Sequence, residues 1–269
     1  MRTTLTLLLV LSPVVTLAAD KLAERDARVN RIARVGVKIT FDNRKKERPP
    51  VALRLTHVPD KDIRADIDAL DTLQFVEAEI KKASDEDLEP IAKLPQLKRL
   101  TITGDFGDDS VKALANATKL ERLTIGSSKL TNQCLPVIGE LPKLSSLIVS
   151  QSRAMDDAGL KLLRPARELR VLDANGFIID GSGFADLKAL TRLEEFSAHG
   201  VQITDNSIRP LRDLKLKSLR LSNTSVTDAG LRHIEEMDGL RLLSISGVAI
   251  TRDGINSLSR KKPRLQINK

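Results

Sequence analysis

Leucine and isoleucine recur along this chain on a fixed spacing. The pattern Leu-x-x-Leu-x-Leu has apolar residues at its first, fourth and sixth positions, and it starts at Leu97, Leu120, Leu144, Leu169, Leu193, Leu216 and Leu240. Successive starts lie 23 to 25 residues apart, and weaker copies begin near residues 51–55 and at Leu70. Because alternate residues of a strand point to opposite faces, each copy predicts a short strand with one apolar face.

A second pattern follows each predicted strand. Val226-Thr227-Asp228 leads to Leu231 and Ile234, an apolar stripe with helical spacing. Thr is a good helix N-cap, and an Asp just after it favours the positive end of its own helix. One position early in this half is always small, which predicts close backbone packing there; its residues are Ser110, Cys134, Gly159, Gly183, Ser207, Gly230 and Gly254.

The alternation of strand and helix predicts the fold. Parallel strands joined through helices have right-handed connections. No single unit can bury its own leucines, so neighbouring units must stack. We therefore expect an α/β solenoid with parallel strands on the concave face and short helices on the convex face. Cys134, the only cysteine, is expected to be a buried small residue of this core rather than a reactive thiol.

The repeated units resemble those of leucine-rich repeat proteins. The Ile/Val-Thr-Asp-x-Gly-Leu half is similar to the class found in planctomycete-type bacterial exported proteins, and also to the repeats of F-box proteins, whose cysteines are absent here. The resemblance covers about residues 50–269, as about eight repeats with a closing strand at Leu265 and Ile267. It implies a non-catalytic binding scaffold.

The first 19 residues have the layout of a secretory signal peptide. Arg2 precedes an apolar run, and small residues precede Asp20. The run is shorter than the ~20 residues that span a bilayer, and Pro13 interrupts it. We expect cleavage, export to the periplasm or the exterior, and no membrane span in the mature chain. The alternative is an uncleaved segment that anchors the chain in the membrane.

Residues 20–49 differ from the repeats and are predicted to cap the first one. Residues 22–37 are charged and suited to a helix, whereas Val35, Val37, Ile39 and Phe41 alternate as in a strand. The basic stretch 43–50 follows as a loop. The alternative is a disordered basic leader.

The net charge of +8 is concentrated at the ends of the chain. Residues 20–50 hold ten Lys/Arg and five Asp/Glu, and residues 251–269 hold six and one. This distribution suggests an alternative function, the binding of an anionic envelope polymer or a membrane surface through the basic ends. The simpler interpretation is that both ends are solvated. With six Phe and no Trp or Tyr, the chain lacks stacking aromatics, so we expect no nucleic-acid partner.

The strand positions that face away from the core offer a candidate binding surface. Their central column is predicted to be Gln74, Thr101, Thr124, Ile148, Asp173, Ser197, Arg220 and Ser244. Charged and nucleophilic groups gather in the later units, at Arg170, Asp173, Glu195, Ser197, His199 and Arg220. Neighbouring strands lie ~4.8 Å apart, so these side chains can form one patch. We predict that this patch contacts a protein partner, with solvated surface charge as the alternative.

Asp173, Ser197 and His199 also suggest a hydrolytic triad. Such a triad needs a hydrogen-bonded nucleophile and base, and a pocket that an open sheet does not provide. The three histidines fall in different units, which disfavours a metal site, and there is no Gly-rich phosphate loop. We therefore expect no enzyme activity and no cofactor. The identity of the partner and the oligomeric state are left open.

Overall fold

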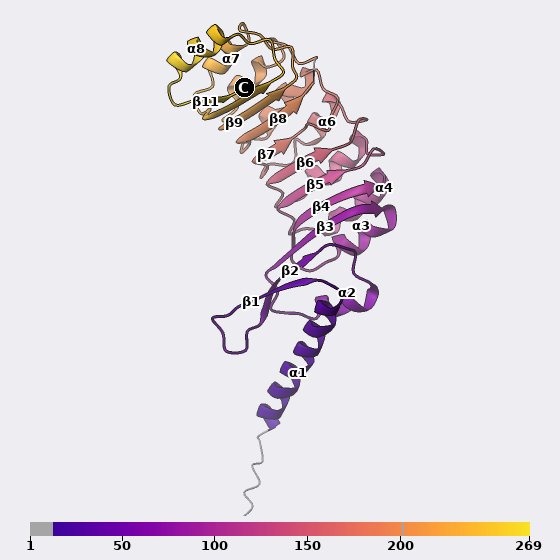
Figure 1. The fold of residues 1–269 in the computed structure, drawn as a ribbon. Coiled ribbons are helices and arrows are strands. Elements are labelled where there is room, and N and C mark those ends of the chain that lie inside the picture. Colours follow the sequence, from indigo (N-terminus) through magenta and orange to yellow (C-terminus); the bar gives the residue numbers. More distant parts are fainter. Residues whose placement is uncertain (1–12, 201) are drawn as a thin grey trace, which may run out of the picture.

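The computed structural model describes residues 13–200 and 202–269. They form an α/β structure around one eleven-stranded sheet whose strands lie side by side in chain order (Figure 1). β2 to β11 pair in parallel, and β1 pairs antiparallel with β2. The strands are β1 (Lys38–Phe41), β2 (Pro50–Leu55), β3 (Phe75–Ser84), β4 (Leu97–Asp105), β5 (Arg122–Gly126), β6 (Ser146–Ser150), β7 (Val171–Asp173), β8 (Glu195–His199), β9 (Ser218–Ser222), β10 (Leu242–Ser246) and β11 (Gln266–Asn268).

Short helices connect the parallel strands. The row of strands bends, and α3, α4 and α6 lie on the outside of the bend (Figure 1). The α-helices are α1 (Pro13–Arg34), α2 (Lys61–Asp68), α3 (Asp85–Ala92), α4 (Asp108–Val111), α5 (Leu135–Gly139), α6 (Asp157–Leu162), α7 (Leu231–Glu235) and α8 (Arg252–Lys261). Several connections are 3₁₀ helices instead, namely η1 (Lys112–Asn116), η2 (Asn132–Cys134), η3 (Ser182–Ala189) and η4 (Arg209–Asp213).

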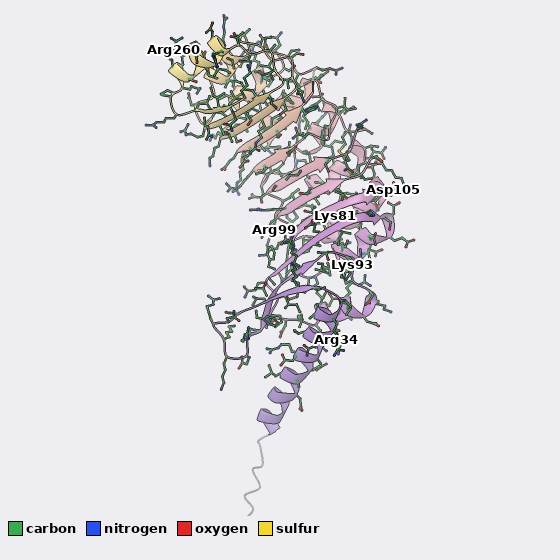
Figure 2. All side chains as sticks on the ribbon, in the orientation of Figure 1. Arg34, Lys81, Lys93, Arg99, Asp105 and Arg260 are labelled. Carbon is green, nitrogen blue, oxygen red and sulfur yellow. The ribbon has the colours of Figure 1, made fainter. Side chains whose placement is uncertain are left out.

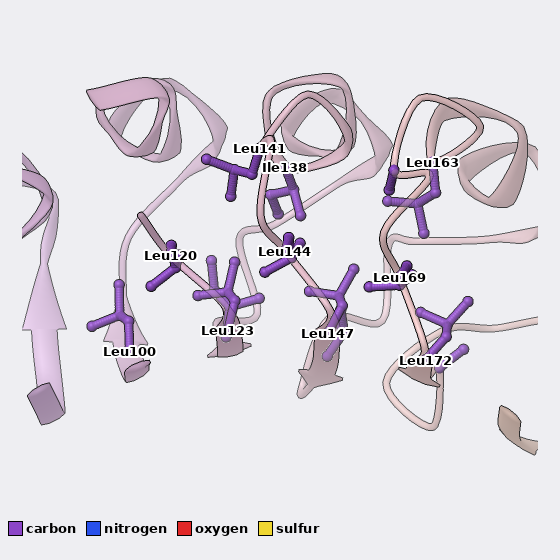
Figure 3. Packing of buried hydrophobic residues seen from close by; sticks show 14 of the residues in the cluster. Leu100, Leu120, Leu123, Ile138, Leu141, Leu144, Leu147, Leu163, Leu169 and Leu172 are labelled. Atoms are coloured by element: carbon purple, nitrogen blue, oxygen red, sulfur yellow. The ribbon is translucent and has the colours of Figure 1, made fainter. Parts of the chain in front are cut away.

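The core lies between the sheet and the helices and consists of in-register apolar columns. Leu100, Leu123, Leu147 and Leu172 occupy the same position on four successive strands and are each at most 1% exposed (Figure 3). Burial of each such side chain contributes about 2 kcal/mol. The residues between them along each strand, such as Thr101 and Thr124, are half-buried and face the other way. The strands predicted from the leucine spacing are therefore confirmed.

Aspartate side chains join several units to the next at the start of the helical half. Asp108 accepts hydrogen bonds from the backbone N of Thr131 (2.9 Å) and from its hydroxyl (2.6 Å). Asp228 holds Thr251 in the same way, at 2.8 and 2.6 Å. We expected each Asp to favour its own helix, but these carboxylates bind the threonine of the following unit. The threonine caps are confirmed at Thr131 and Thr251, whose hydroxyls accept helix N–H groups.

The small residues of the helical half are required by close contacts between units. A Cβ added to Gly183 would lie 2.4 Å from the carbonyl oxygen of Asp157, and one added to Gly254 would lie 2.2 Å from a carboxylate oxygen of Asp228. Cys134 occupies the equivalent place, is 1% exposed, and donates from Sγ to the Thr131 carbonyl at 3.3 Å. Its prediction as a buried core residue is confirmed.

The N-terminal segment lies beside β2. Residues 1–12 of the predicted signal peptide lie outside the described residues, and α1 begins at Pro13 and ends at Arg34. Strand pairing begins only at Lys38, later than the apolar alternation predicted, because Gly36 adopts a φ of +83° and turns the chain after the helix.

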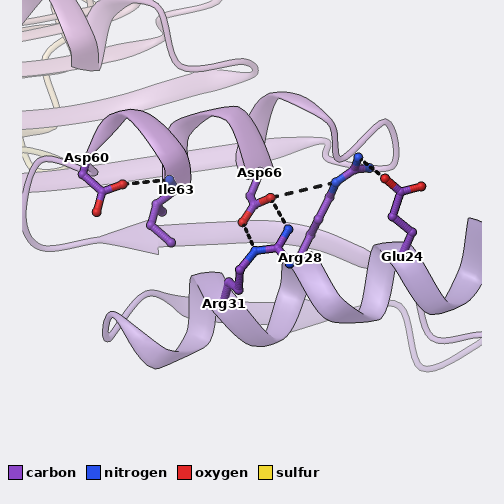
Figure 4. A network of polar contacts seen from close by, with 6 residues as sticks. All are labelled: Glu24, Arg28, Arg31, Asp60, Ile63 and Asp66. Carbon is purple, nitrogen blue, oxygen red and sulfur yellow. Dashed lines mark hydrogen bonds and ion pairs between the residues drawn. The ribbon is translucent and has the colours of Figure 1, made fainter.

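An ion pair fastens α1 to α2. The guanidinium of Arg31 donates two hydrogen bonds, of 2.7 and 2.6 Å, to the carboxylate of Asp66, which is only 8% exposed (Figure 4). Arg28 approaches the same carboxylate at 3.9 Å. The hydrogen bonds from Arg31 lower the pKa of Asp66. Val29 and Ile32 on the same helix are buried, so both apolar and ionic contacts hold α1 against the rest of the structure.

Candidate functional site

The face of the sheet opposite the helices, which we call the open face, carries the predicted patch. Asp173, Ser197 and Arg220 lie opposite one another on β7, β8 and β9. Glu195 and His199 follow the same alternation on β8, two residues before and after Ser197. The register thus brings these five residues together, as the sequence analysis expected.

Arg170 lies in a different row, just before β7. Its Nη1 contacts Glu194 Oε1 at 3.0 Å, and Lys217 Nζ contacts Glu194 Oε2 at 2.9 Å. This row of alternating charge follows the edge where the strands begin. Arg170 therefore belongs to an ion-pair row beside the patch, and its charge is balanced within the chain.

Ser197 is less accessible than the sequence analysis expected. It is 4% exposed, because the side chain of Asn175 from the bend after β7 donates from Nδ2 to its hydroxyl at 3.0 Å. Asn175 also donates its backbone N–H to Asp173 at 3.0 Å. Asn175 was not among the predicted site residues. The sequence did contain a signal for its role, namely its place two residues after Asp173. An amide side chain in the bend after one strand can reach a residue on the next strand.

The ionisation of Asp173 reflects its burial. Burial raises the pKa of Asp173, while the hydrogen bond from Asn175 and the charge of Arg220 act in the opposite direction. Arg220 is shared with Glu195, whose Oε2 lies 3.7 Å from Nη1. The patch is consequently a set of mutually balanced side chains with a half-buried carboxyl at its centre.

The three triad candidates do not form a nucleophile–base pair. The Ser197 hydroxyl is bound to Asn175, and His199 Nδ1 lies 3.5 Å from Asn223 Nδ2. Within the described part of the chain, no hydrogen bond joins Ser197 to His199. An open depression of about 590 Å³ lies elsewhere, where α3 and α4 begin, and none of the candidate residues lines it.

The predicted column on the open face needs one correction. Glu79, not Gln74, lies opposite Thr101, because Ala78 and Ile80 of β3 pair with Leu100 and Ile102. The sequence pattern placed this unit too early, since an alanine occupies the position where leucine was expected. An acidic side chain therefore replaces the amide on the β3 section of the face.

The first half of the open face carries a charged row that the sequence analysis did not single out. Lys38, Arg54, Glu77, Arg99 and Arg122 lie opposite one another across β1 to β5. Figure 2 labels Arg99 near the start of β4 and Asp105 at its end. The signal was present in the sequence, because an arginine precedes the central leucine in both Arg99-Leu100 and Arg122-Leu123.

Among residues 13–200 and 202–269, no group of three or more His, Cys, Asp or Glu side chains is arranged to hold a metal ion. No helix in the same part of the chain has the length and apolar character needed to cross a membrane.

Comparison with known proteins does not place this chain in a family. No protein-family model matches the sequence, and a search of curated proteins finds no match.

Proposed function

We propose that this chain is an exported leucine-rich repeat scaffold that binds another protein, in the cell envelope or outside the cell, through the concave open face of its solenoid. The observation that supports it best is the continuity of this face. Its rows of mostly polar side chains cross neighbouring strands from Lys38 on β1 to Ser244 on β10, with apolar residues only at Ile148, Val171 and Leu242 in the two rows that contain Arg99 and Thr101. A wide surface of this kind suits many weak polar contacts with an extended partner.

The burial of Ser197 favours a binding role for the patch over hydrolysis. Ser197, the only nucleophile of the predicted patch, is buried beneath Asn175. The patch also offers groups that can contact charged side chains of a partner. Two carboxylates and a guanidinium lie on adjacent strands, at Asp173, Glu195 and Arg220.

The alternative is electrostatic attachment through the basic ends. At the C-terminal end, Lys261 contacts both carboxylate oxygens of Glu235 at 2.8 Å, and Lys262 donates to the Met237 carbonyl at 2.8 Å. Of the C-terminal cations Lys261, Lys262 and Arg264, two are therefore already bound within the chain. We rank this alternative second for that reason.

A capture experiment separates the two functions. The mature chain, starting at Asp20, is immobilised beside a variant with Asp173→Lys, Glu195→Lys and Arg220→Glu. A control variant makes the same charge change on the helical side, with Glu140→Lys, Asp238→Lys and Arg232→Glu, all exposed positions. Envelope proteins that bind the native chain and the control, but not the open-face variant, support the proposal.

Other outcomes count against the proposed function. Capture by all three chains that high salt reverses, and that Lys261→Glu, Lys262→Glu and Arg264→Glu abolish, would establish the electrostatic alternative instead. The export prediction is checked separately, by N-terminal sequencing of the protein recovered from the envelope fraction, where Asp20 is the expected first residue.

A further inference from the structure

We propose that Arg99, Thr101, Arg122 and Thr124 form a binding site for the carboxylate side chains of an acidic segment of a partner protein. This inference rests on the proposed function and names the chemistry of the partner. The site lies on β4 and β5, away from the patch around Asp173.

The four side chains form a compact set of hydrogen-bond donors. Arg99 lies directly opposite Arg122, and Thr101 lies directly opposite Thr124. Leu100 separates the two β4 residues and is buried on the other face, so both pairs lie on the open face. Adjacent strands are ~4.8 Å apart, which places two guanidinium groups and two hydroxyl groups within reach of one peptide segment.

The charges of the two arginines are unusual for this face. The other two arginines within the strands have a carboxylate on a neighbouring strand, Arg54–Glu79 at 2.9 Å and Arg220–Glu195 at 3.7 Å. Neither Arg99 nor Arg122 has an ion-pair partner within 4 Å among the described residues. Like charges placed directly opposite on paired strands repel each other. A bound carboxylate would relieve this repulsion in the way that the chain itself does at the other arginines.

The donors are oriented and unoccupied. The guanidinium carbon of Arg99 lies 5.1 Å from the centre of the Phe75 ring, a cation–π contact that positions the group and leaves its N–H donors free. The hydroxyls of Thr101 and Thr124 make no hydrogen bond to any side chain or backbone group that the structure describes. The site therefore offers directional donors that are not already bound within the chain.

The borders of the site favour an acidic protein segment over a long polyanion. Glu77 lies opposite Arg99 on β3, and Glu79 lies opposite Thr101. On the other side, β6 presents the uncharged Ser146 and Ile148. A phosphate or sugar-acid chain that crosses the strands would meet the two glutamates. A peptide can place carboxylates at alternate residues, ~6.8 Å apart on one side of an extended chain, over the two guanidinium groups only.

The test measures peptide binding to the full mature chain at low salt. A fluorescent peptide with two glutamates at alternate positions in a glycine–serine sequence is compared with the same peptide carrying glutamines. We expect the glutamate peptide to bind at least tenfold more tightly by fluorescence anisotropy. The double variant Arg99→Gln, Arg122→Gln should lose this preference, whereas Arg232→Gln, Arg252→Gln, which removes equal charge from exposed positions on α7 and α8, should keep it.

A second variant tests the hydroxyl groups without changing charge. Thr101→Val with Thr124→Val retains side-chain shape on solvent-facing strand positions and should weaken glutamate-peptide binding several-fold. Inorganic phosphate and polyphosphate serve as competing probes. Equal loss in both arginine double variants, or tighter binding of polyphosphate than of the peptide, would overturn the acidic-segment site.

The result can be separated from that of the proposed function. If the chain captures a protein partner through Asp173, Glu195 and Arg220 but shows no preference for the glutamate peptide, this site is wrong and the scaffold function stands. If peptide binding depends on Arg99 and Arg122 but no partner is captured through the open face, the site stands as an isolated carboxylate receptor and the wider function fails.

Discussion

The carboxylate of Asp205 accepts two hydrogen bonds from Thr227 of the following unit. One oxygen binds the backbone N–H and the other binds the hydroxyl, each at 2.8 Å. A Cβ added to Gly230, one turn further on, would lie 2.3 Å from the same carboxylate. Thr227 in turn accepts the N–H of Ala229 at 3.2 Å. One aspartate therefore fixes the spacing of two units and the start of the next helical segment.

Replacement of Asp205 by Ala should lower the free energy of unfolding by about 1–3 kcal/mol, because two hydrogen bonds to a charged acceptor are lost. Asp205→Asn should cost less, since Asn132 already fills this role earlier in the chain, where its Oδ1 accepts the backbone N–H of Asp156 at 3.2 Å. Urea unfolding followed by circular dichroism measures both. Equal losses in the two variants would show that charge, rather than hydrogen-bond geometry, is what matters.

Substitution of Gly183 by Ala should destabilise the protein by about 1–3 kcal/mol, because the new methyl group meets the Asp157 carbonyl and cannot be accommodated without a backbone shift. Gly107→Ala is the matched control, since an added Cβ there has no atom within 4 Å. Its change should be close to zero, with the loss at the helix N-cap offset by reduced freedom of the unfolded chain. Thermal denaturation of both variants compares them, and a neutral Gly183→Ala would contradict the close contact.

The ion pair between Arg31 and Asp66 should make stability depend on pH. Its hydrogen bonds hold the pKa of Asp66 below the ordinary value of 3.8, so the pair contributes fully above about pH 4 and is lost as the pH falls through the lowered pKa. Asp66→Asn should therefore lower Tm by a few degrees at pH 7, and the difference from the native chain should shrink below pH 4. Asp62→Asn, an exposed change on the same helix, should show little difference at either pH.

The thiol of Cys134 should be inert in the folded protein. Burial raises its pKa to about 12, so fewer than about one thiol in a thousand is ionised at pH 8. Ellman's reagent should detect almost no free thiol at pH 8 in the native chain and one per chain in guanidinium chloride, as the single cysteine requires. Rapid native labelling would mean that the helical half opens readily.

The sequence predicted the strands well wherever leucine occupied the fourth position of the pattern. It failed at β3, where Ala78 stands in that position and pairs with Leu100, because a small side chain gives a weak periodic signal. It also failed at the start of β1, where a single glycine turn at Gly36 overrides the apolar alternation. At β3 the hydrophobic pattern was too weak to place the strand, and at β1 the backbone conformation outweighed it.

The sequence predicted which residues of the candidate patch share one face, but not how exposed they are. Alternation alone placed Asp173, Ser197 and Arg220 on one face. The burial of Ser197 depends on the conformation of Asn175 in the bend after β7, which periodicity does not report. The arginine pair on β4 and β5 was overlooked for a related reason. Which β3 residues border it, Glu77 and Glu79, follows from the register of β3, which the sequence pattern had misplaced.

The order of the strands also bears on how the chain can fold and lengthen. Each parallel strand pairs only with the strand before it and the strand after it in the sequence. The loop that must close before a new strand can pair is therefore always one unit long, and its entropic cost does not grow with the length of the array. Contacts of such uniform and modest sequence separation favour rapid folding. A duplication of one whole unit in the gene would add a strand without lengthening any existing connection.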